Sequence, residues 1–150
     1  MDNFSALVDL IIKNEIDGTP KHEQVLFLGT TPPYLVEHAG FDLLPLITKG
    51  KTISKICFDH GVKTSVIKRL PEIIQKPKSV FAPALKVHRD SVVVLTFELH
   101  RGAPIIIPVK KNVKVGRGAT NYNIVTSTYA KDSGDIEQRW RDEKLLIWEP

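Results

Sequence analysis

Apolar residues near the start of the chain recur with the spacing of an amphipathic helix. They predict a helix over residues 4–16, which ends where a glycine and a proline follow at 17–20. Two further helices are expected over residues 31–40 and 52–61. In each, a threonine can cap the first turn and a glycine can close the last.

The second half of the chain changes to short apolar runs rich in β-branched residues. Extended structure is expected there at 92–97, 105–109, 124–129 and 145–148, and in the first half also at 25–28 and 43–47. A hairpin connection is expected at 100–104, a Gly-rich basic stretch fills 110–119, and a short polar segment at 135–141 fits a helix. Because helices come first and strands later, the order predicts an α+β fold with a mainly antiparallel sheet, in a single domain over residues 1–150.

The predicted helix over 52–61 carries one residue of chemical interest. Ile53, Ile56, Cys57 and His60 fall at positions i, i+3, i+4 and i+7, so His60 is expected on the apolar face. Two interpretations stay open. An imidazolium at a helix C-terminus is favoured by the helix dipole, which is a purely structural reason for the residue. A histidine among basic residues is also a candidate for moving a proton.

Charge is strongly segregated along the chain. Residues 49–118 hold fifteen basic and four acidic residues, a net charge of +11, whereas residues 1–48 are net −5 and 119–150 are net −2. Such a field favours a polyanion, and nucleic acid is the obvious one. The alternative is a solvated basic surface that only keeps the protein soluble.

Composition narrows the function classes. Cys57 is the single cysteine, so no disulfide framework and no cysteine-based metal site is expected. The five histidines have no metal-ligand spacing and the acids of the basic segment are scattered, which predicts no metal and no cofactor. No apolar stretch approaches the length of a membrane helix and the N-terminus has no signal-peptide pattern. We therefore expect no membrane partner and a cytoplasmic site of action, with delivery by a machine that reads no cleavable signal left open.

A late polar strand could carry metal-free chemistry. Alternation along residues 126–131 places Ser127, Tyr129 and Lys131 on one side of the strand. A hydroxyl, a phenol and an ammonium group suit RNA cleavage by attack of the 2′-hydroxyl on its neighbouring phosphate. The alternative is a solvent-facing strand edge on which Tyr129 only packs.

Five other residues are candidates for contact with phosphate. Lys49 and Lys51 precede the helix at 52–61, His100 and Arg101 lie in the expected hairpin turn, and Arg117 lies between two glycines. Each could equally be an exposed residue of a solvated loop. The stretch around Arg117 lacks the pattern of a nucleotide-binding P-loop.

Several short sequences in a fixed order resemble a known family. They include Leu28-Gly29-Thr30-Thr31-Pro32, an LPxxxxxP pattern at 70–77 and the SxYxK pattern at 127–131. From about residue 25 onward this order resembles the phage-associated branch of the barnase–EndoU–colicin–RelE-like (BECR) superfamily, small RNases of phage proteins and polymorphic toxins. The resemblance implies N-terminal helices packed on a twisted, mainly antiparallel sheet of about four strands. Residues 1–24 lie outside it, as an N-terminal helical extension.

The resemblance also implies a function. It assigns His60, Ser127, Tyr129 and Lys131 to a metal-independent endoribonuclease site, with products that end in 2′,3′-cyclic phosphates. A phage-encoded or toxin-type effector of this kind would have an acidic protein inhibitor as a further partner, because a basic cleft favours one. The alternative is a non-catalytic module that binds nucleic acid or acts as an adaptor in phage assembly or defence.

Overall fold

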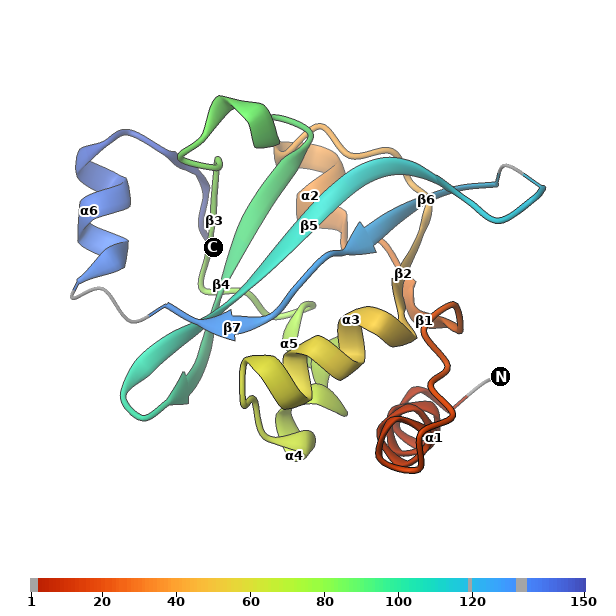
Figure 1. The fold of residues 1–150 in the computed structure, drawn as a ribbon. Helices are drawn as coiled ribbons and strands as arrows, with labels where there is room; N and C mark the ends of the chain where they lie inside the picture. The colour runs from red at the N-terminus through yellow and green to blue at the C-terminus, as the bar shows by residue number, and fades with distance from the viewer. Residues whose placement is uncertain (1–2, 119, 132–134) are drawn as a thin grey trace.

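The fold is known from a computed structural model, which describes residues 3–118, 120–131 and 135–150. The first half supplies two strands as well as helices (Figure 1). Its elements are α1 (Phe4–Ile16), β1 (Val25–Thr30), α2 (Pro33–His38), β2 (Pro45–Lys49), α3 (Gly50–Ser54), the π-helical turn η1 (Lys55–Asp59), α4 (Thr64–Ile67) and α5 (Leu70–Ile73).

The second half supplies most of the sheet. Its elements are β3 (Ser79–Phe81), the 3-10 turn η2 (Lys86–His88), β4 (Ser91–His100), β5 (Ala103–Val115), β6 (Thr120–Val125), β7 (Tyr129–Ala130), α6 (Ile136–Asp142) and β8 (Leu146–Trp148). The eight strands form one mixed sheet in the order β1-β2-β6-β5-β4-β3-β8, and β7 pairs with β5 beside this path. Strands β2 and β6 run parallel, and the other pairs are antiparallel.

The expected sheet of about four strands with N-terminal helices packed on it is therefore wrong. Extended structure was expected at β1 and β2, but β3 was not expected, and neither was the joining of the early and late strands into one sheet; β2 joins the later strands through two parallel pairs with β6. Strand β5 continues through the basic stretch to Val115, where no strand was expected. Long-range pairing of short strands has no local signal, which is why the sequence pattern missed it. Ala119, the last residue of that stretch, lies outside the described residues.

The two faces of the sheet have different neighbours. On one side, which we call the helix face, Val94, Ile107 and Val125 pack in a buried cluster with apolar residues of α1, α2, α3, α4 and α5. On the other side, the α6 face, Leu95 and Ile106 pack with residues of α6 in a second, smaller cluster. In Figure 1, α2 passes behind β5 and α6 lies at the left end of the sheet, so the right-hand part of the α6 face has no helix over it.

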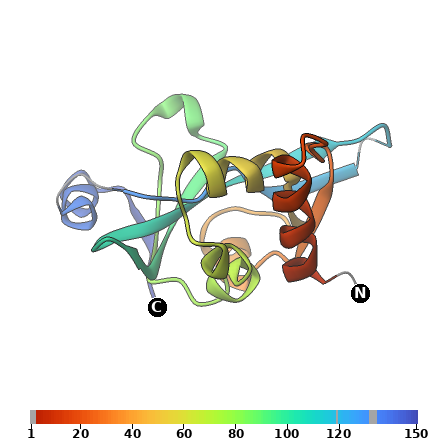
Figure 2. The same ribbon diagram turned by 60° about the horizontal axis from the view of Figure 1, so that its bottom comes forward.

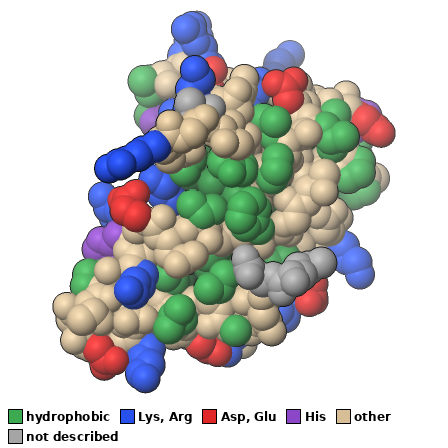
Figure 3. All heavy atoms as spheres, turned by 90° about the vertical axis from the view of Figure 1, so that its right-hand side faces the viewer, with side chains coloured by type: hydrophobic (Ala, Val, Ile, Leu, Met, Phe, Trp, Pro, Cys, Tyr) green, Lys and Arg blue, Asp and Glu red, His purple; other side chains and the backbone are tan. Residues whose placement is uncertain are grey.

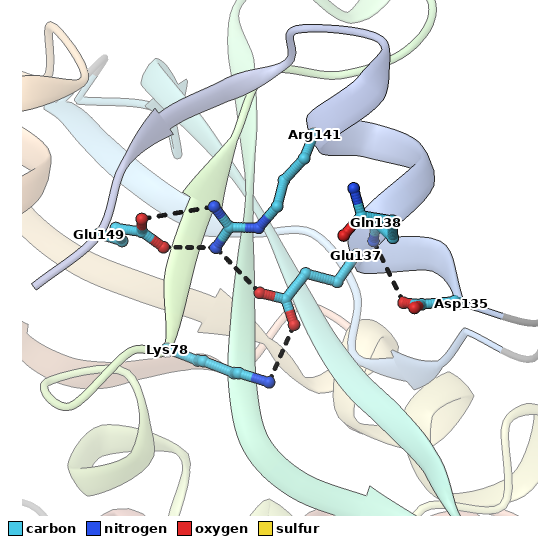
Figure 4. Close-up of polar contacts among 6 residues, drawn as sticks. All are labelled: Lys78, Asp135, Glu137, Gln138, Arg141 and Glu149. Atoms are coloured by element: carbon cyan, nitrogen blue, oxygen red, sulfur yellow. Dashed lines mark hydrogen bonds and ion pairs between the residues drawn. The ribbon is translucent and has the colours of Figure 1, made fainter.

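An ion-pair network joins α6 to the neighbouring strands (Figure 4). The Glu137 carboxylate accepts from Lys78 at 2.9 Å and from Arg141 at 3.0 Å, and Arg141 also donates to Glu149 beyond β8. Burial raises the pKa of Glu137, but the hydrogen bonds from Lys78 and Arg141 outweigh it, so this pKa lies below its ordinary value. These ion pairs thus hold the C-terminal segment against the edge of the sheet.

Strands β5 and β6 continue beyond β4 as a two-stranded ribbon of residues 110–118 and 120–121, which we call the arm; Lys110, at its base, still pairs with Ser91 of β4, and the arm projects to the right in Figure 1. The buried amide of Asn123 positions its base. It donates to the Thr31 hydroxyl and to the Asp42 carbonyl, and accepts from the backbone N–H of Asn112 at 3.0 Å. Asn112 has a φ of 57° at the bulge where the pairing register of β5 and β6 shifts. Seen from below in Figure 2, the arm continues the sheet away from α6.

Among the described residues, no helix is both long and apolar enough to span a bilayer.

Candidate functional site

His60 is presented by a change of helix type. The backbone N–H of His60 donates to the carbonyl of Lys55 five residues earlier, which is the hydrogen bond of a π-helix. The regular α-helical spacing expected over 52–61 therefore fails after Ser54. The extra residue in the turn rotates His60 away from the apolar face, and the side chain is exposed instead of inward. Such π-turns occur often at functional sites.

The exposed imidazole contacts the late polar strand. His60 Nε2 lies 3.5 Å from the Ser127 hydroxyl, at the long end of hydrogen-bond distance. The imidazole and the Tyr129 ring lie with centroids 5.3 Å apart and planes inclined by 34°. The end of η1 and strand β7 are neighbours in Figure 1 as well. His60, Ser127 and Tyr129 thus form one cluster, which we call the His60 cluster. In the sequence, His60 is 67 residues or more from the other two.

A cavity adjoins this cluster on the α6 face. It measures about 400 Å³, and Ser127, Tyr129 and Lys131 all line it, together with His88 and Trp140. Thr126 lines the same cavity, although strict alternation places it on the other side, because β6 ends at Val125 and β7 begins only at Tyr129. Partial burial raises the pKa of the Tyr129 phenol, so this side chain is a neutral hydrogen-bond donor at neutral pH.

The other two lysine candidates lie on the opposite side of η1 from His60, near the start of α3. Lys49 ends β2 and pairs with Glu23 at 3.2 Å. Lys51 is exposed in the first turn of α3, where its backbone N–H donates to the His22 carbonyl. Lys49 and Lys51 lie at the start of α3, whereas His60 follows the end of η1, so about two and a half to three helical turns (about 3.6 residues each) separate them, and neither lysine is part of the His60 cluster.

His100, Arg101 and Arg117 lie at the two ends of β5. His100 ends β4 and pairs with Ala103, Arg101 lies in the hairpin turn with a φ of 52°, and Arg117 lies at the tip of the arm. Strand β5 spans 13 residues between these ends, or about 43 Å at 3.3 Å per residue. Arg101 and Arg117 therefore cannot contact the same phosphate group.

A metal site and a second cavity are the other possible functional sites, and both have less support. Among the residues that the structure describes, no three His, Cys, Asp or Glu side chains come together in a group that could hold a metal ion. A larger cavity of about 650 Å³ lies between α5 and the β4–β5 hairpin, but the Arg69–Glu98 pair on its wall, at 2.6 Å, already neutralises its main charges.

Two features of the site were not foreseen from the sequence. The first is the arm, which carries Lys110, Lys111, Lys114 and Arg117 on a rigid ribbon instead of a loop. The chain has no acidic residue between Glu98 and Asp132, and this charge pattern was the signal that could have revealed it. The second is the exposed aromatic pair of Phe27 and Tyr122 on β1 and β6, for which the sequence carries no local signal.

The arrangement defines a small domain with a cationic arm, an open sheet face and a histidine–hydroxyl–phenol cluster beside a cavity. Comparison with known families then identifies its class: residues 52–149 match the family described as phage MuF-C-terminal domain, and the chain belongs to this phage-associated family. No curated protein and no solved structure matches the chain.

The expected membership of the barnase–EndoU–colicin–RelE-like superfamily is therefore wrong. The sequences that carried the resemblance have local structural explanations. Pro71 lies in the first turn of α5, where proline is favoured, and Pro77 follows after the helix has ended. The SxYxK pattern is the alternation of a short strand, β7, and its flanks. Patterns of this kind recur wherever the same local structure is needed.

Proposed function

We propose that this phage domain binds nucleic acid through the arm and the open part of the α6 face. The observation that carries the proposal is the arm itself, which carries four basic residues: Lys114 and Arg117 lie beyond β4, and Lys110 and Lys111 lie at the base of the arm. Among the described residues, none of Lys110, Lys114 and Arg117 forms an ion pair, so each is available to a phosphate. A two-stranded ribbon with basic side chains on both faces and at its tip suits a phosphate backbone.

The test is the salt dependence of binding to a labelled RNA or DNA, measured by fluorescence anisotropy. Affinity should fall linearly with salt on a double-logarithmic plot. The double variant Lys114→Ala, Arg117→Ala should lower the slope by about one for each phosphate that the protein no longer neutralises. Lys13→Ala, an exposed lysine on α1, is the matched control and should leave the slope unchanged. Absence of binding at low salt would contradict the proposal.

A second candidate function is metal-independent RNA cleavage at the His60 cluster. The specific observation in its favour is the approach of His60 Nε2 to the Ser127 hydroxyl, with the Tyr129 ring alongside and Lys131 on the adjoining cavity. In this reaction the 2′-oxygen forms a bond to phosphorus while the bond from phosphorus to the 5′-oxygen breaks. His60 would take the proton of the 2′-hydroxyl or give one to the leaving oxygen. Lys131 would stabilise the phosphorane, and Ser127 and Tyr129 would orient the phosphate.

Incubation of total RNA with the protein in a chelator, followed by end-group analysis, tests this candidate. The expected products end in 2′,3′-cyclic phosphates, and His60→Ala should slow their formation by about 10²- to 10⁴-fold. His38→Ala is the matched control, because His38 stacks on Trp148 far from the cluster along the sheet. If the chelator prevents cleavage, or if His60→Ala cleaves like the wild type, this candidate fails while binding can still stand.

A further inference from the structure

The part of the α6 face that helix α6 does not cover contains a row of paired residues that crosses four strands. The strand registers place Phe27 opposite Ile47, Ile47 opposite Ile124, and Ile124 opposite Lys110. These four residues therefore form one row across β1, β2, β6 and β5, all on the same side of the sheet. Tyr122 lies two residues before Ile124 on β6 and so shares this side. We call these five residues the platform.

The platform is apolar in its middle and aromatic at its edge. Ile47 has no exposed surface although it belongs to neither buried cluster, because its neighbours in the row cover it. Phe27 is the neighbour of Ile47 in this row, and its side chain is 45% exposed. Its ring meets that of Tyr122 edge to face, with centroids 6.0 Å apart and planes inclined by 69°. An exposed phenylalanine held in a fixed orientation offers a flat face to a ligand.

Charge surrounds this apolar surface. Lys110 ends the row, is exposed, and has no ion-pair partner among the residues described. The neighbouring acids are Asp90, in the cavity beside Lys110, and Glu23, which pairs with Lys49. Viewed from the side of β1 and the arm, hydrophobic side chains gather near the middle, and basic and acidic side chains lie around them (Figure 3). Aromatic faces with flanking cations fit stacked bases with their phosphates.

The platform is continuous with the His60 cluster. Tyr122 and Ser127 are five residues apart, which is about 16 Å along an extended chain. Between them lies a cavity of about 280 Å³ lined by Lys110 and Thr126, and next to it the 400 Å³ cavity lined by Ser127 and Tyr129. A strand of a few nucleotides could thus lie along β6 from one site to the other.

We propose that the platform is a stacking site for single-stranded nucleic acid, with a base on Phe27 and a phosphate on Lys110. The inference rests on the proposed nucleic-acid binding and names its substrate class. A duplex hides its base faces in the stack, so Phe27 could not stack on a base of an intact duplex, whereas an unpaired strand exposes every base. RNA and DNA strands share this chemistry, and the binding experiment separates them.

The test compares four labelled probes of equal length: single-stranded RNA, single-stranded DNA and a duplex of each. Phe27→Leu keeps an apolar side chain over Ile47 but removes the aromatic face, and should weaken binding of a single strand by about tenfold. Binding of the duplexes should change less than about twofold, since their contacts are with phosphates. Phe97→Leu, at an aromatic residue that is 66% exposed on the β4–β5 hairpin, is the matched control and should change neither.

Two outcomes are distinguishable. If the wild type binds no probe, the proposed function and the platform both fail. If the wild type binds but Phe27→Leu binds single strands equally well, the platform fails and nucleic-acid binding by the arm stands. Ultraviolet crosslinking of the wild type to single-stranded RNA, with mapping of the modified peptide, is independent of how the variant folds. The crosslink should fall on the β1 or β6 peptide, and crosslinks confined to other segments would overturn the inference.

Discussion

The two ends of the α6 face differ in what their charged and aromatic side chains contact. At the end that α6 covers, Trp140 packs against Phe81 with ring centroids 5.3 Å apart, and Lys78, Glu137 and Arg141 form ion pairs. At the end near the arm, Phe27 is half exposed, and Lys110 has no ion pair within the described part of the chain. The same sheet face is closed at one end and open at the other.

The difference separates residues that hold the fold from residues that are available to a ligand. Aromatic and charged groups that already have partners lower the free energy of the folded state and have little left to offer another molecule. Exposed groups on the same scaffold contribute little to stability, and their contacts are made with whatever binds. Substitutions at the two ends should therefore act on different measurements.

The largest effect on stability is expected for Trp140→Ala. Trp140 is 7% exposed and anchors α6 in the smaller buried cluster, so its removal leaves a cavity beside Phe81. The free energy of unfolding should fall by about 3–5 kcal/mol, as measured by urea denaturation. Leu43→Ala, at a residue that is 69% exposed, is the control and should change it little. A small loss for Trp140→Ala would mean that α6 is not part of the folded core.

A somewhat smaller effect is expected for Asn123→Ala at the base of the arm. The substitution removes the buried amide that bonds Thr31, Asp42 and Asn112, and leaves their polar groups without partners. The loss should be about 2–3 kcal/mol in urea denaturation. Hydrogen exchange at the Asn112 amide should also become faster. Unchanged exchange would show that the bulge, and hence the direction of the arm, does not depend on Asn123.

The ion pairs of the covered end predict a dependence on pH. Because the pKa of Glu137 is lowered in the folded state, its contribution to stability is present above its unfolded pKa of about 4.3 and is lost as pH falls through the folded value. Glu137→Gln should therefore destabilise the protein at pH 7 by about 1 kcal/mol or less, and by less still at pH 3. Urea denaturation at both pH values measures this. Glu143→Gln, in the long 3.9 Å pair with Arg139, is the control.

The smallest effect on stability is expected at the open end. Lys110→Ala should change the free energy of unfolding by no more than about 0.5 kcal/mol, because the exposed ammonium group has no ion pair among the described residues to lose. The same variant should lower the salt dependence of nucleic-acid binding. A marked loss of stability would indicate that Lys110 serves the fold, and the contrast between the two ends would disappear.

Much of the local structure could be predicted because it depends on neighbouring residues. The apolar spacing of the first helix matches α1 at Phe4–Ile16. The hairpin turn between two β-branched runs lies where β4 meets β5. Which strands pair could not be predicted, since the parallel pairing of β2 with β6 joins segments far apart in the chain.

The candidate site shows the same division. That His60 and the Ser127–Lys131 strand carry suitable chemical groups could be seen in the sequence, but the approach of His60 to Ser127 depends on the π-turn of η1 and on tertiary packing. The five expected phosphate contacts were chosen for charge alone, and the structure distributes them over distant places. Charge type is a property of the residue, whereas the position of a charge is a property of the fold.

Local periodicity and charge were enough to predict where α1 and the β4–β5 hairpin form and that basic residues dominate the middle of the chain. These follow from helical and strand periodicity and from counting ionisable groups, which need no knowledge of distant contacts. Only the tertiary structure decided which charges are paired, which aromatic rings stay exposed, and that the basic stretch forms an arm. Those outcomes depend on which surfaces pack together, and burial and pairing exist only once segments distant in the chain have met.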